Sequence, residues 1–400
     1  MSTTKIEKLI NSHSSQVFLY FTNSTALRDW FCDGATADPH VGGRLYCWWN
    51  GGYYTSGEYL QLTQDEFISF IWLGRGEPHA TIVDVKLIKR KAGTLLRLAH
   101  RKLGRSSKWI AISTEYEKEW TKALNNLASV LENGEDLRIT SRPMLGIFTD
   151  EFNDIIAKKL GVPIGQGLRI SGVVEGLGAQ KAGLIANDII IGLDGQEITG
   201  AATFGAYIGN KKAGDIIEVT FYRCAEKQTT SMTLSGRPIP PIPRTGLELS
   251  KQVEPVYKQY EGEIKSLLNG ASEEDCIRKP SPMEWSANEV LAHLIHSELG
   301  WQNIVSEIIG GHEGAYDDFG GNIQAYIDGT VSTFHTKDAL FKELKNHDTE
   351  TLNLYTHISE DFLTYKGKFW KLAFQANQNA YHLQTHLEQM RSAIQEAQNK

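Results

Sequence analysis

The chain lacks several features that would assign it to a class at once. Its 400 residues include no apolar run near the roughly 18 residues that span a bilayer, and no apolar segment near the start suits a secretory signal. Basic residues are also outnumbered by acidic ones, because 41 Lys and Arg against 48 Asp and Glu give a formal net charge of −7. A general nucleic-acid binder would carry a basic stripe. We therefore expect a soluble protein without a membrane span or a nucleic-acid partner.

Cysteine is scarce and scattered. The four cysteines form neither a CxxC pair nor a spacing typical of disulfides; they are Cys32, Cys47, Cys224 and Cys276. Free thiols in a reducing compartment are the simplest account. The composition therefore predicts a cytoplasmic protein.

The composition and periodicity of the sequence change at two points. Asn133-Gly134 is a turn signal that closes a helical stretch, and residues 237–244 hold four prolines in eight positions, which indicates a stiff, extended linker. A chain of this length is expected to form two to four domains. We predict a multidomain α+β protein with domains at 1–136, 140–236 and 245–397, and with 237–244 as the linker.

The first segment has the pattern of a sheet closed by a helix. Strand-like runs at 59–63, 67–72 and 81–88 are separated by glycine-rich turns, as in antiparallel hairpins. A later apolar stripe at helical spacing consists of Trp120, Leu124, Leu127 and Leu131. Ser113 is the expected N-cap of that helix.

In order, these motifs resemble the SRPBCC (START-like) superfamily, in the branch of Aha-type heat-shock ATPase activator homologues. The matching stretches are 27–30, 41–43, 57–58, 70–72, 93–96 and 120–134. The resemblance implies a helix-grip domain whose sheet wraps around one long helix and encloses a pocket for an apolar small molecule or a partner protein. Nothing in the segment supports heat-shock ATPase activation itself.

Aromatic side chains often line such pockets, and the candidates are Trp30, Trp72 and Trp120. The alternative is that these tryptophans, together with Trp48 and Trp49, are core residues.

The second segment is glycine-rich and β-branched. Its phrases at 179–184, 187–198 and 213–223 resemble, in order, a PDZ domain of the bacterial protease-associated kind, although Asn187 stands where glycine is usual. The resemblance implies a β-barrel-like domain that binds the C-terminus of a peptide or protein by strand addition. The implied carboxylate loop is Met144, Leu145, Gly146 and Ile147, and Phe204 and Ile208 would face the last side chain of the peptide. The alternative is a vestigial groove. We find neither a GxSxG elbow nor a credible Ser/His/Asp set, so no protease is expected.

The third segment shows helical periodicity almost throughout. We expect helices over about 245–270, from Ser286, over 321–346 and over 366–397, which together suggest a four-helix bundle. Ser286 and Glu289 form a capping box at the second helix.

Eight of the twelve histidines lie in this segment, namely His293, His296, His312, His335, His347, His357, His382 and His386. The pair His382 and His386 has the i, i+4 spacing that places two imidazoles on one face of a helix. About 0.4 such pairs are expected by chance in this composition, so the spacing alone is weak evidence. His293 lies in a capped helix and is flanked by apolar residues. We therefore expect its imidazole to face the bundle interior and to converge with those of His382 and His386.

The combination of 285–294 with 382–389 resembles the DinB/YfiT-like superfamily. The resemblance implies that His293, His382 and His386 bind a divalent metal, zinc in the first place, with nickel or iron as alternatives. His296 has no counterpart in the motif, and His296, His312, His335, His347 and His357 are expected to face solvent. The alternative is an interior histidine cluster without metal.

Two functions remain open from the sequence. One is a cytoplasmic multidomain binding protein with an apolar ligand or partner pocket, a peptide groove and a three-histidine metal site. The other is a metal-dependent thiol transferase or hydrolase of the DinB/YfiT-like type, to which the other modules recruit substrate. A three-histidine site leaves coordination positions open, as catalytic metals require. Glu298 or Asp361 could be the base, although no motif places either one, and the sequence does not decide whether the chain is an enzyme.

Overall fold

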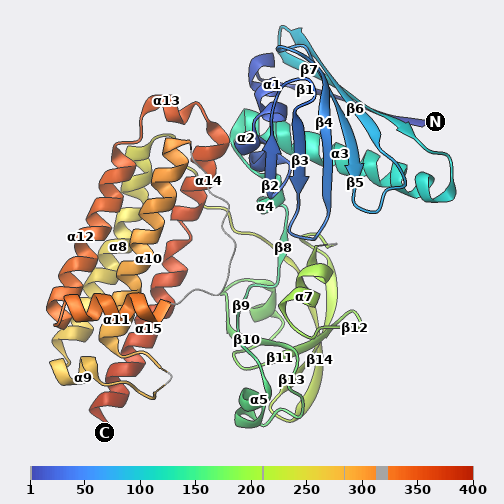
Figure 1. Ribbon diagram of the computed structural model, residues 1–400. Helices are drawn as coiled ribbons and strands as arrows, with labels where there is room; N and C mark the ends of the chain where they lie inside the picture. The colour runs from blue at the N-terminus through green and yellow to red at the C-terminus, as the bar shows by residue number, and fades with distance from the viewer. Residues whose placement is uncertain (1, 210, 283, 312–322, 400) are drawn as a thin grey trace. The chain divides into compact units, whose positions relative to one another are not determined.

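The computed structural model describes residues 2–209, 211–282, 284–311 and 323–399. These residues form two compact units, one made of Met1–Glu135 with Pro240–Lys400 and the other of Asp136–Ile239. The first unit contains the N-terminal domain and the helical bundle, and the second is the middle domain (Figure 1).

The N-terminal domain is a seven-stranded antiparallel sheet in the order β1-β7-β6-β5-β4-β3-β2. Its strands are β1 Ser2–Ile10, β2 Gly34–Ala37, β3 Arg44–Trp48, β4 Tyr54–Thr63, β5 Phe67–Gly74, β6 Thr81–Arg90 and β7 Gly93–Leu103. Its helices are α1 Ser14–Thr22, α2 Ser24–Trp30 and α3 Ser107–Asn133, of which α3 crosses one face of the sheet (Figure 1). Alternate residues of β6 and β7 are buried, as expected for a sheet with one covered face. The predicted sheet-and-helix fold is confirmed.

The start of α3 differs from the prediction. The N-cap is Ser106, whose side chain accepts a hydrogen bond from the backbone N–H of Trp109. Ser113 lies inside the helix and donates its hydroxyl to the Trp109 carbonyl at 2.7 Å. The prediction of Ser113 as N-cap is wrong because Trp109 is buried and extends the apolar stripe toward the N-terminus. The helix ends at Gly134, in the left-handed conformation typical of a C-cap.

The middle domain contains a sheet in the order β14-β13-β11-β10-β9, to which β12 is added beside β11. The strands are β9 Ile147–Asp150, β10 Leu168–Val173, β11 Ile189–Leu193, β12 Gln196–Glu197, β13 Ile216–Arg223 and β14 Glu226–Thr233, and β8 Pro143–Met144 pairs with β15 Ser235–Gly236. The helices are α4 Leu137–Thr140, α5 Asp154–Leu160, α6 Gly178–Lys181 and α7 Ala201–Ile208. Asn187 has φ 69°, a conformation that asparagine tolerates better than most residues, and its side chain accepts hydrogen bonds from Arg169.

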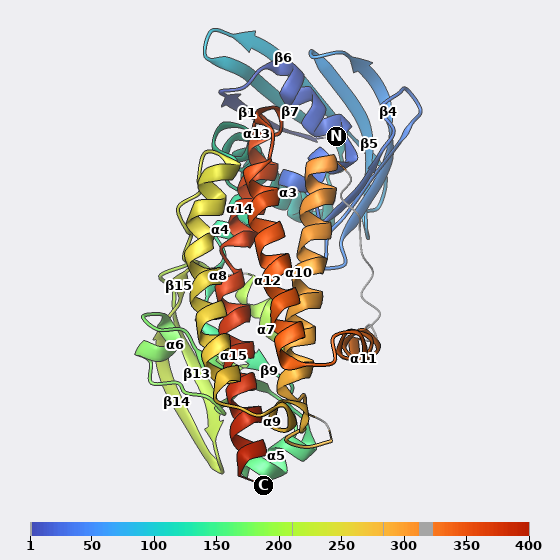
Figure 2. The ribbon, with the colours of Figure 1, turned by 90° about the vertical axis from the view of Figure 1, so that its left-hand side faces the viewer.

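The C-terminal segment is a helical bundle. Its long helices are α8 Gly246–Asn269, α10 Ala287–Gly310, α12 Lys337–Thr356 and α15 Asn379–Gln398, and α14 Lys366–Ala376 leads into α15. Figures 1 and 2 show the long helices side by side, with α11 Ile323–Thr333 lying across them. Short helices α9 Glu273–Ile277 and α13 Glu360–Leu363 complete the bundle.

Two predicted helices are interrupted. The stretch predicted over 321–346 is divided into α11 and α12, because Thr336 caps a new helix by accepting a hydrogen bond from the N–H of Ala339. The stretch predicted over 366–397 is divided between α14 and α15 at residues 377–378. The bundle prediction is confirmed, but its third long helix is α12.

A buried ion pair joins the N-terminal domain to the bundle within the first unit. Lys368 of α14 donates to Asp29 of α2 at 2.7 Å, and the two residues are 9% and 6% exposed. Beside them, Lys366 donates to the Glu132 carbonyl at 2.8 Å. Gly367 lies so close to Val130 that a Cβ there would come within 2.7 Å of a Val130 methyl carbon.

Replacing Asp29 by alanine removes the carboxylate opposite a buried ammonium group. We expect Asp29→Ala to lower the free energy of unfolding by about 3–5 kcal/mol, measured by urea denaturation, and Asp29→Leu combined with Lys368→Met to lower it by much less. The control is Glu7→Ala in the exposed Glu7–Arg97 pair, with an expected change under about 1 kcal/mol. Equal effects of Asp29→Ala and Glu7→Ala would contradict the assigned role of this contact.

Candidate functional site

Two helices of the bundle bring the three predicted histidines together. His293 lies in the second turn of α10, after the Ser286–Glu289 capping box, and His382 and His386 lie one turn apart on α15. One ring nitrogen from each histidine lies within 4.8 Å of the other two. All three side chains are half-buried. The structure therefore places the predicted triad as a single cluster.

The ring nitrogens are arranged as ligands of one ion would be. Nε2 of His293 and Nε2 of His382 are 3.2 Å apart. Two nitrogens bound to one tetrahedral zinc at 2.0–2.1 Å would be about 3.3–3.4 Å apart. A shared proton would join this pair alone and would not involve Nε2 of His386. The donor set and its spacing fit a divalent metal.

One interaction orients the third imidazole. Nδ1 of His386 lies 2.8 Å from Oε1 of Gln389, and because an amide oxygen only accepts, Nδ1 carries the proton. Nε2 of His386 therefore keeps its lone pair, and the bond resembles the outer contacts that orient metal-bound histidines. Gln389 belongs to the stretch 382–389 that carries the family resemblance, but no sequence pattern assigns it this role.

The environment keeps the imidazoles neutral. Burial, followed by the neighbouring rings of His386, His382 and His296, lowers the pKa of His293 to about 4. Burial and His386 lower the pKa of His382 to about 4, and burial lowers the pKa of His386, although the hydrogen bond that its Nδ1–H donates to Gln389 acts in the opposite direction. At neutral pH all three rings offer lone pairs, which is the form that binds a metal.

Trp285 and α11 form a wall beside the cluster. The Trp285 ring lies against His293 with 4.9 Å between centroids, and its indole N–H donates to Gln324 at 3.1 Å. Gln324 also donates to Glu289 at 3.2 Å, so that α11 is tied to the cap of α10. Sequence reasoning missed Gln324, because its contact depends on how α11 crosses the bundle.

The other histidines only partly follow the prediction of solvent exposure. His335 and His357 are exposed, and His312 lies outside the described residues. His296 is half-buried, and its ring stacks on Tyr326 with 3.7 Å between centroids; His347 is half-buried beside Glu343. The prediction is wrong for His296 and His347, because packing of α11 and α12 against α10 covers them.

Among the described residues, neither suggested base forms a hydrogen bond or an ion pair with the histidine triad. Glu298 is buried among other helices, where it accepts a hydrogen bond from Tyr257 of α8 at 3.0 Å. Asp361 is exposed on α13. The cluster around Glu298 also contains Asp348 of α12, which is 5% exposed.

In the middle domain, the predicted peptide-binding residues lie around an end strand. β9 is the last strand of its sheet and pairs with β10, so its other edge is open to strand addition. Gly146 has φ 81°, and its carbonyl accepts from the N–H of Val174, while the Leu145 carbonyl accepts from Ala179. Met144, however, belongs to β8 and pairs with Ser235.

Helix α7 carries the other two residues predicted to contact a peptide. Phe204 and Ile208 are partly buried and pack against the same core as Ile147. The helix is anchored by Tyr207, whose hydroxyl donates to Asp194 at 2.6 Å. Hydrogen bonds from Lys211 and then Tyr207 lower the pKa of Asp194 to about 2. This anchor was not foreseen, because Asp194 and Tyr207 are far apart in the sequence.

The tryptophans predicted to line a pocket are interior residues. Trp30, Trp72 and Trp120 are 1–4% exposed. Their indole N–H groups donate to the Tyr20 carbonyl, the Tyr116 hydroxyl and the His100 ring, respectively. Trp30 and Trp120 therefore have the arrangement of core residues, whereas the Trp72 indole N–H also donates to Glu77 at 3.3 Å. Trp48, by contrast, is 36% exposed.

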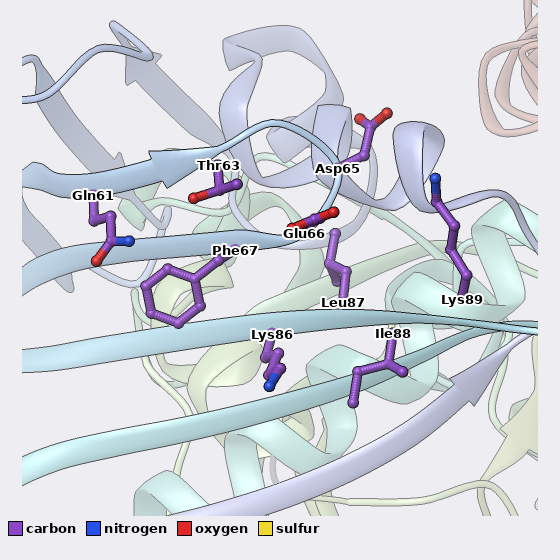
Figure 3. A pocket seen from close by; sticks show the side chains of 9 residues that line it. All are labelled: Gln61, Thr63, Asp65, Glu66, Phe67, Lys86, Leu87, Ile88 and Lys89. Atoms are coloured by element: carbon purple, nitrogen blue, oxygen red, sulfur yellow. The ribbon is translucent and has the colours of Figure 1, made fainter.

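The surface also has two grooves that lie away from the predicted site residues. One of about 600 Å³ lies where the β4–β5 turn meets β6, and Figure 3 shows its lining of mixed charge, including Asp65, Glu66, Lys86 and Lys89. Another of about 730 Å³ lies beside β12 in the middle domain. Neither contains the histidine triad.

The fold defines a three-domain chain: a sheet-and-helix domain, a smaller β domain and a helical bundle that contains a cluster of three histidines. Family models match the same three segments in the same order. Residues 11–132 match the activator of Hsp90 ATPase homolog 1-like protein family, 143–234 the PDZ domain, and 257–390 the DinB superfamily. The predicted identity and order of the domains are confirmed.

Curated relatives resemble the middle domain. A probable periplasmic serine endoprotease DegP-like of Marinomonas sp. (strain MWYL1) is 35% identical over 101 residues, covering 25% of this chain and 22% of the relative. The serine protease Do-like HtrA of Bacillus subtilis (strain 168) is 40% identical over 78 residues, covering 19% and 17%. The chain thus spans about a quarter or less of these relatives.

Solved structures resemble about a third of the chain. The Aha1 dimer from Colwellia psychrerythraea is 17% identical, with a TM-score of 0.30, covering 33% of this chain and 97% of that one. An Hsp90 activator from Plasmodium falciparum is 24% identical, with a TM-score of 0.29, covering 33% and 96%. Likeness at this level carries no conclusion about function. Among the described residues, no helix has the length and apolar character to cross a membrane.

Asp348 makes stability depend on pH. Burial, followed by the carboxylates of Glu298 and Glu261, raises the pKa of Asp348 to about 8. The folded chain therefore holds a proton that the unfolded chain releases near pH 4, so this group lowers stability progressively from about pH 4 to about pH 8. We expect Asp348→Asn to raise the free energy of unfolding at pH 8 by on the order of 3 kcal/mol, with little change at pH 4.

The measurement is urea unfolding at pH 4, 6 and 8, with the exposed Asp361→Asn as the matched control. The same pH profile in Asp348→Asn and in the parent chain would refute this assignment.

Proposed function

We propose that the chain is a multidomain binding protein whose bundle holds one divalent metal ion, zinc first, through His293, His382 and His386. We further propose that the middle domain captures the C-terminal end of a peptide. The single observation that carries the metal proposal is the convergence of three neutral imidazoles, with 3.2 Å between two of their Nε2 atoms. Apolar neighbours hold these rings in place, so they cannot disperse into solvent.

The metal proposal predicts a graded series of variants. The full chain should bind about one equivalent of zinc, and His382→Ala should abolish stoichiometric binding because two imidazoles remain. Gln389→Ala should keep the stoichiometry at saturating zinc but weaken affinity by about 10–100-fold, because the His386 ring loses its orienting partner.

The measurement is metal analysis after dialysis, together with a competition titration against a chromophoric chelator. The control is His357→Ala, which removes an exposed imidazole of the same bundle. One equivalent of zinc retained by His382→Ala would overturn the assignment.

A catalytic use of the metal is the second candidate. In the described residues the cluster offers three ligands, whereas structural zinc sites usually close with four protein ligands. This supports a thiol transferase or hydrolase in which the metal activates a bound thiol or water. Zinc-loaded protein supplied with low-molecular-weight thiols and an electrophile should then show turnover that His382→Ala lacks. Absence of metal-dependent turnover would favour the binding function.

The peptide proposal rests on the open edge of β9 and the apolar wall of α7. A peptide strand would pair with β9, its carboxylate would meet the loop at residues 145–147, and its last side chain would lie against Phe204 and Ile208. The apolar wall favours peptides that end in an aliphatic residue.

We expect a fluorescent peptide ending in valine to bind with saturation. Phe204→Asp should weaken binding by about tenfold or more, because it puts a charge beside the apolar side chain. Ile155→Asp, on an exposed position of α5, is the control, and fluorescence anisotropy is the measurement. Affinity that survives both Phe204→Asp and amidation of the peptide end would show that the groove is not used.

We place the protein in the cytoplasm. Cys224 is an exposed free thiol, and such thiols persist in reducing compartments. The relatives named as periplasmic share only the middle domain, so their location does not transfer to the whole chain.

A further inference from the structure

Glu77 of the N-terminal domain lies in the turn between β5 and β6. Among the described residues, only one of its two carboxylate oxygens has hydrogen-bond partners. Its Oε1 accepts hydrogen bonds from the Tyr116 hydroxyl, from the Tyr53 hydroxyl at 3.1 Å and from the Trp72 indole at 3.3 Å. Its Oε2 is buried and has no hydrogen-bond partner among the described residues. A carboxylate can accept about four hydrogen bonds, so one whole oxygen is available to a ligand.

Aromatic rings surround this carboxylate. Trp72 meets Tyr116 edge to face with 6.1 Å between centroids, and Trp49 lies 6.5 Å from Trp72 and 5.4 Å from Tyr53. The faces of aromatic rings carry partial negative charge and attract cations. Such rings disfavour an ionised carboxylate that has no counter-ion. A cation bound beside the carboxylate would interact favourably both with it and with the ring faces.

The arrangement is built into the fold. A Cβ on Gly74 would overlap Oε1 of Glu77 and the hydroxyl of Tyr53, so the turn needs glycine to bring these groups together. Two basic side chains lie near this turn, and the charge of His79 favours the ionised form of Glu77. Arg75 donates to the Gly52 carbonyl at 2.7 Å, and the His79 ring packs on Trp109 with 4.6 Å between centroids.

The charge balance of the cluster is consistent with a missing cation. Burial raises the pKa of the Glu77 carboxyl, although hydrogen bonds from Gly74, Tyr53 and Trp72 favour its ionised form. Glu77, Trp49 and Tyr53 are half-buried, so the cluster reaches the surface of the domain.

We propose that Glu77, with the rings of Trp49, Tyr53, Trp72 and Tyr116, binds the ammonium group of a primary organic amine. An N–H of the ammonium group donates to Oε2, and the ring faces surround the adjacent methylene groups. A neutral apolar ligand would leave Oε2 unpaired, so this site prefers an amine over the apolar ligand that the helix-grip fold alone suggests. The site is independent of the metal and peptide sites.

The test uses the full chain and n-butylammonium chloride, with n-butanol as the uncharged probe of equal chain length. Tryptophan fluorescence should change with saturation for butylammonium and not for butanol. Glu77→Gln should weaken butylammonium binding by about tenfold or more, because it removes the charge and keeps the shape. Glu66→Gln, which neutralises an exposed carboxyl of the same domain, is the control and should bind like the parent chain.

Three results would overturn the proposal: no saturable response to butylammonium, equal affinity in Glu77→Gln, or equally tight binding of butanol. If circular dichroism shows that Glu77→Gln does not fold, Trp49→Leu decides, since it removes one ring and leaves the carboxylate. It should weaken binding several-fold. Unchanged affinity in a folded Trp49→Leu would equally overturn the proposal.

Discussion

The close packing of α10 against α15 is the constraint on which the candidate metal centre depends. Leu291 and Leu294 on one helix, and Leu383 and Leu387 on the other, are buried in a common core. Their packing fixes the register of the two helices, and this register brings Nε2 of His293 to 3.2 Å from Nε2 of His382. The imidazoles cannot separate without exposing that core. Apolar burial thus holds three like groups together, and a bound metal would relieve the unfavourable contact it creates.

The same helix connects the metal centre with the rest of its unit. α15 follows α14 after a two-residue break, and α14 is held to the N-terminal domain by the buried pair of Lys368 and Asp29. On the other side of the cluster, Gln324 ties α11 to Trp285 and Glu289. The site is therefore enclosed by elements from several parts of the chain. Rigid support of this kind keeps ligands within the narrow geometry that a metal requires.

Sequence reasoning succeeded where local rules dominate. The capping box at Ser286, the C-cap at Gly134 and the histidine spacing on α15 each depend on residues within one turn, and the structure contains all three. It failed where contacts between elements decide. The burial of His296 depends on how α11 crosses α10, and the true start of α3 depends on the tertiary burial of Trp109. The burial of His296 leaves no periodic or spacing signal, and the apolar stripe of α3 could have been followed back to Trp109 only if its burial had been known.

Depth of burial alone does not distinguish a site from a structural residue, and His100 shows why. It is more buried than any member of the triad, and burial lowers its pKa to about 3. Yet one ring nitrogen meets the Thr81 hydroxyl at 2.7 Å and the other accepts from Trp120 at 3.2 Å, so both are satisfied within the domain. The triad instead directs its nitrogens at one another. A ligand site is thus identified by polar groups whose hydrogen-bonding or coordinating capacity the protein leaves unsatisfied. Where such groups converge on one point, their chemistry indicates the kind of ligand that would bind there.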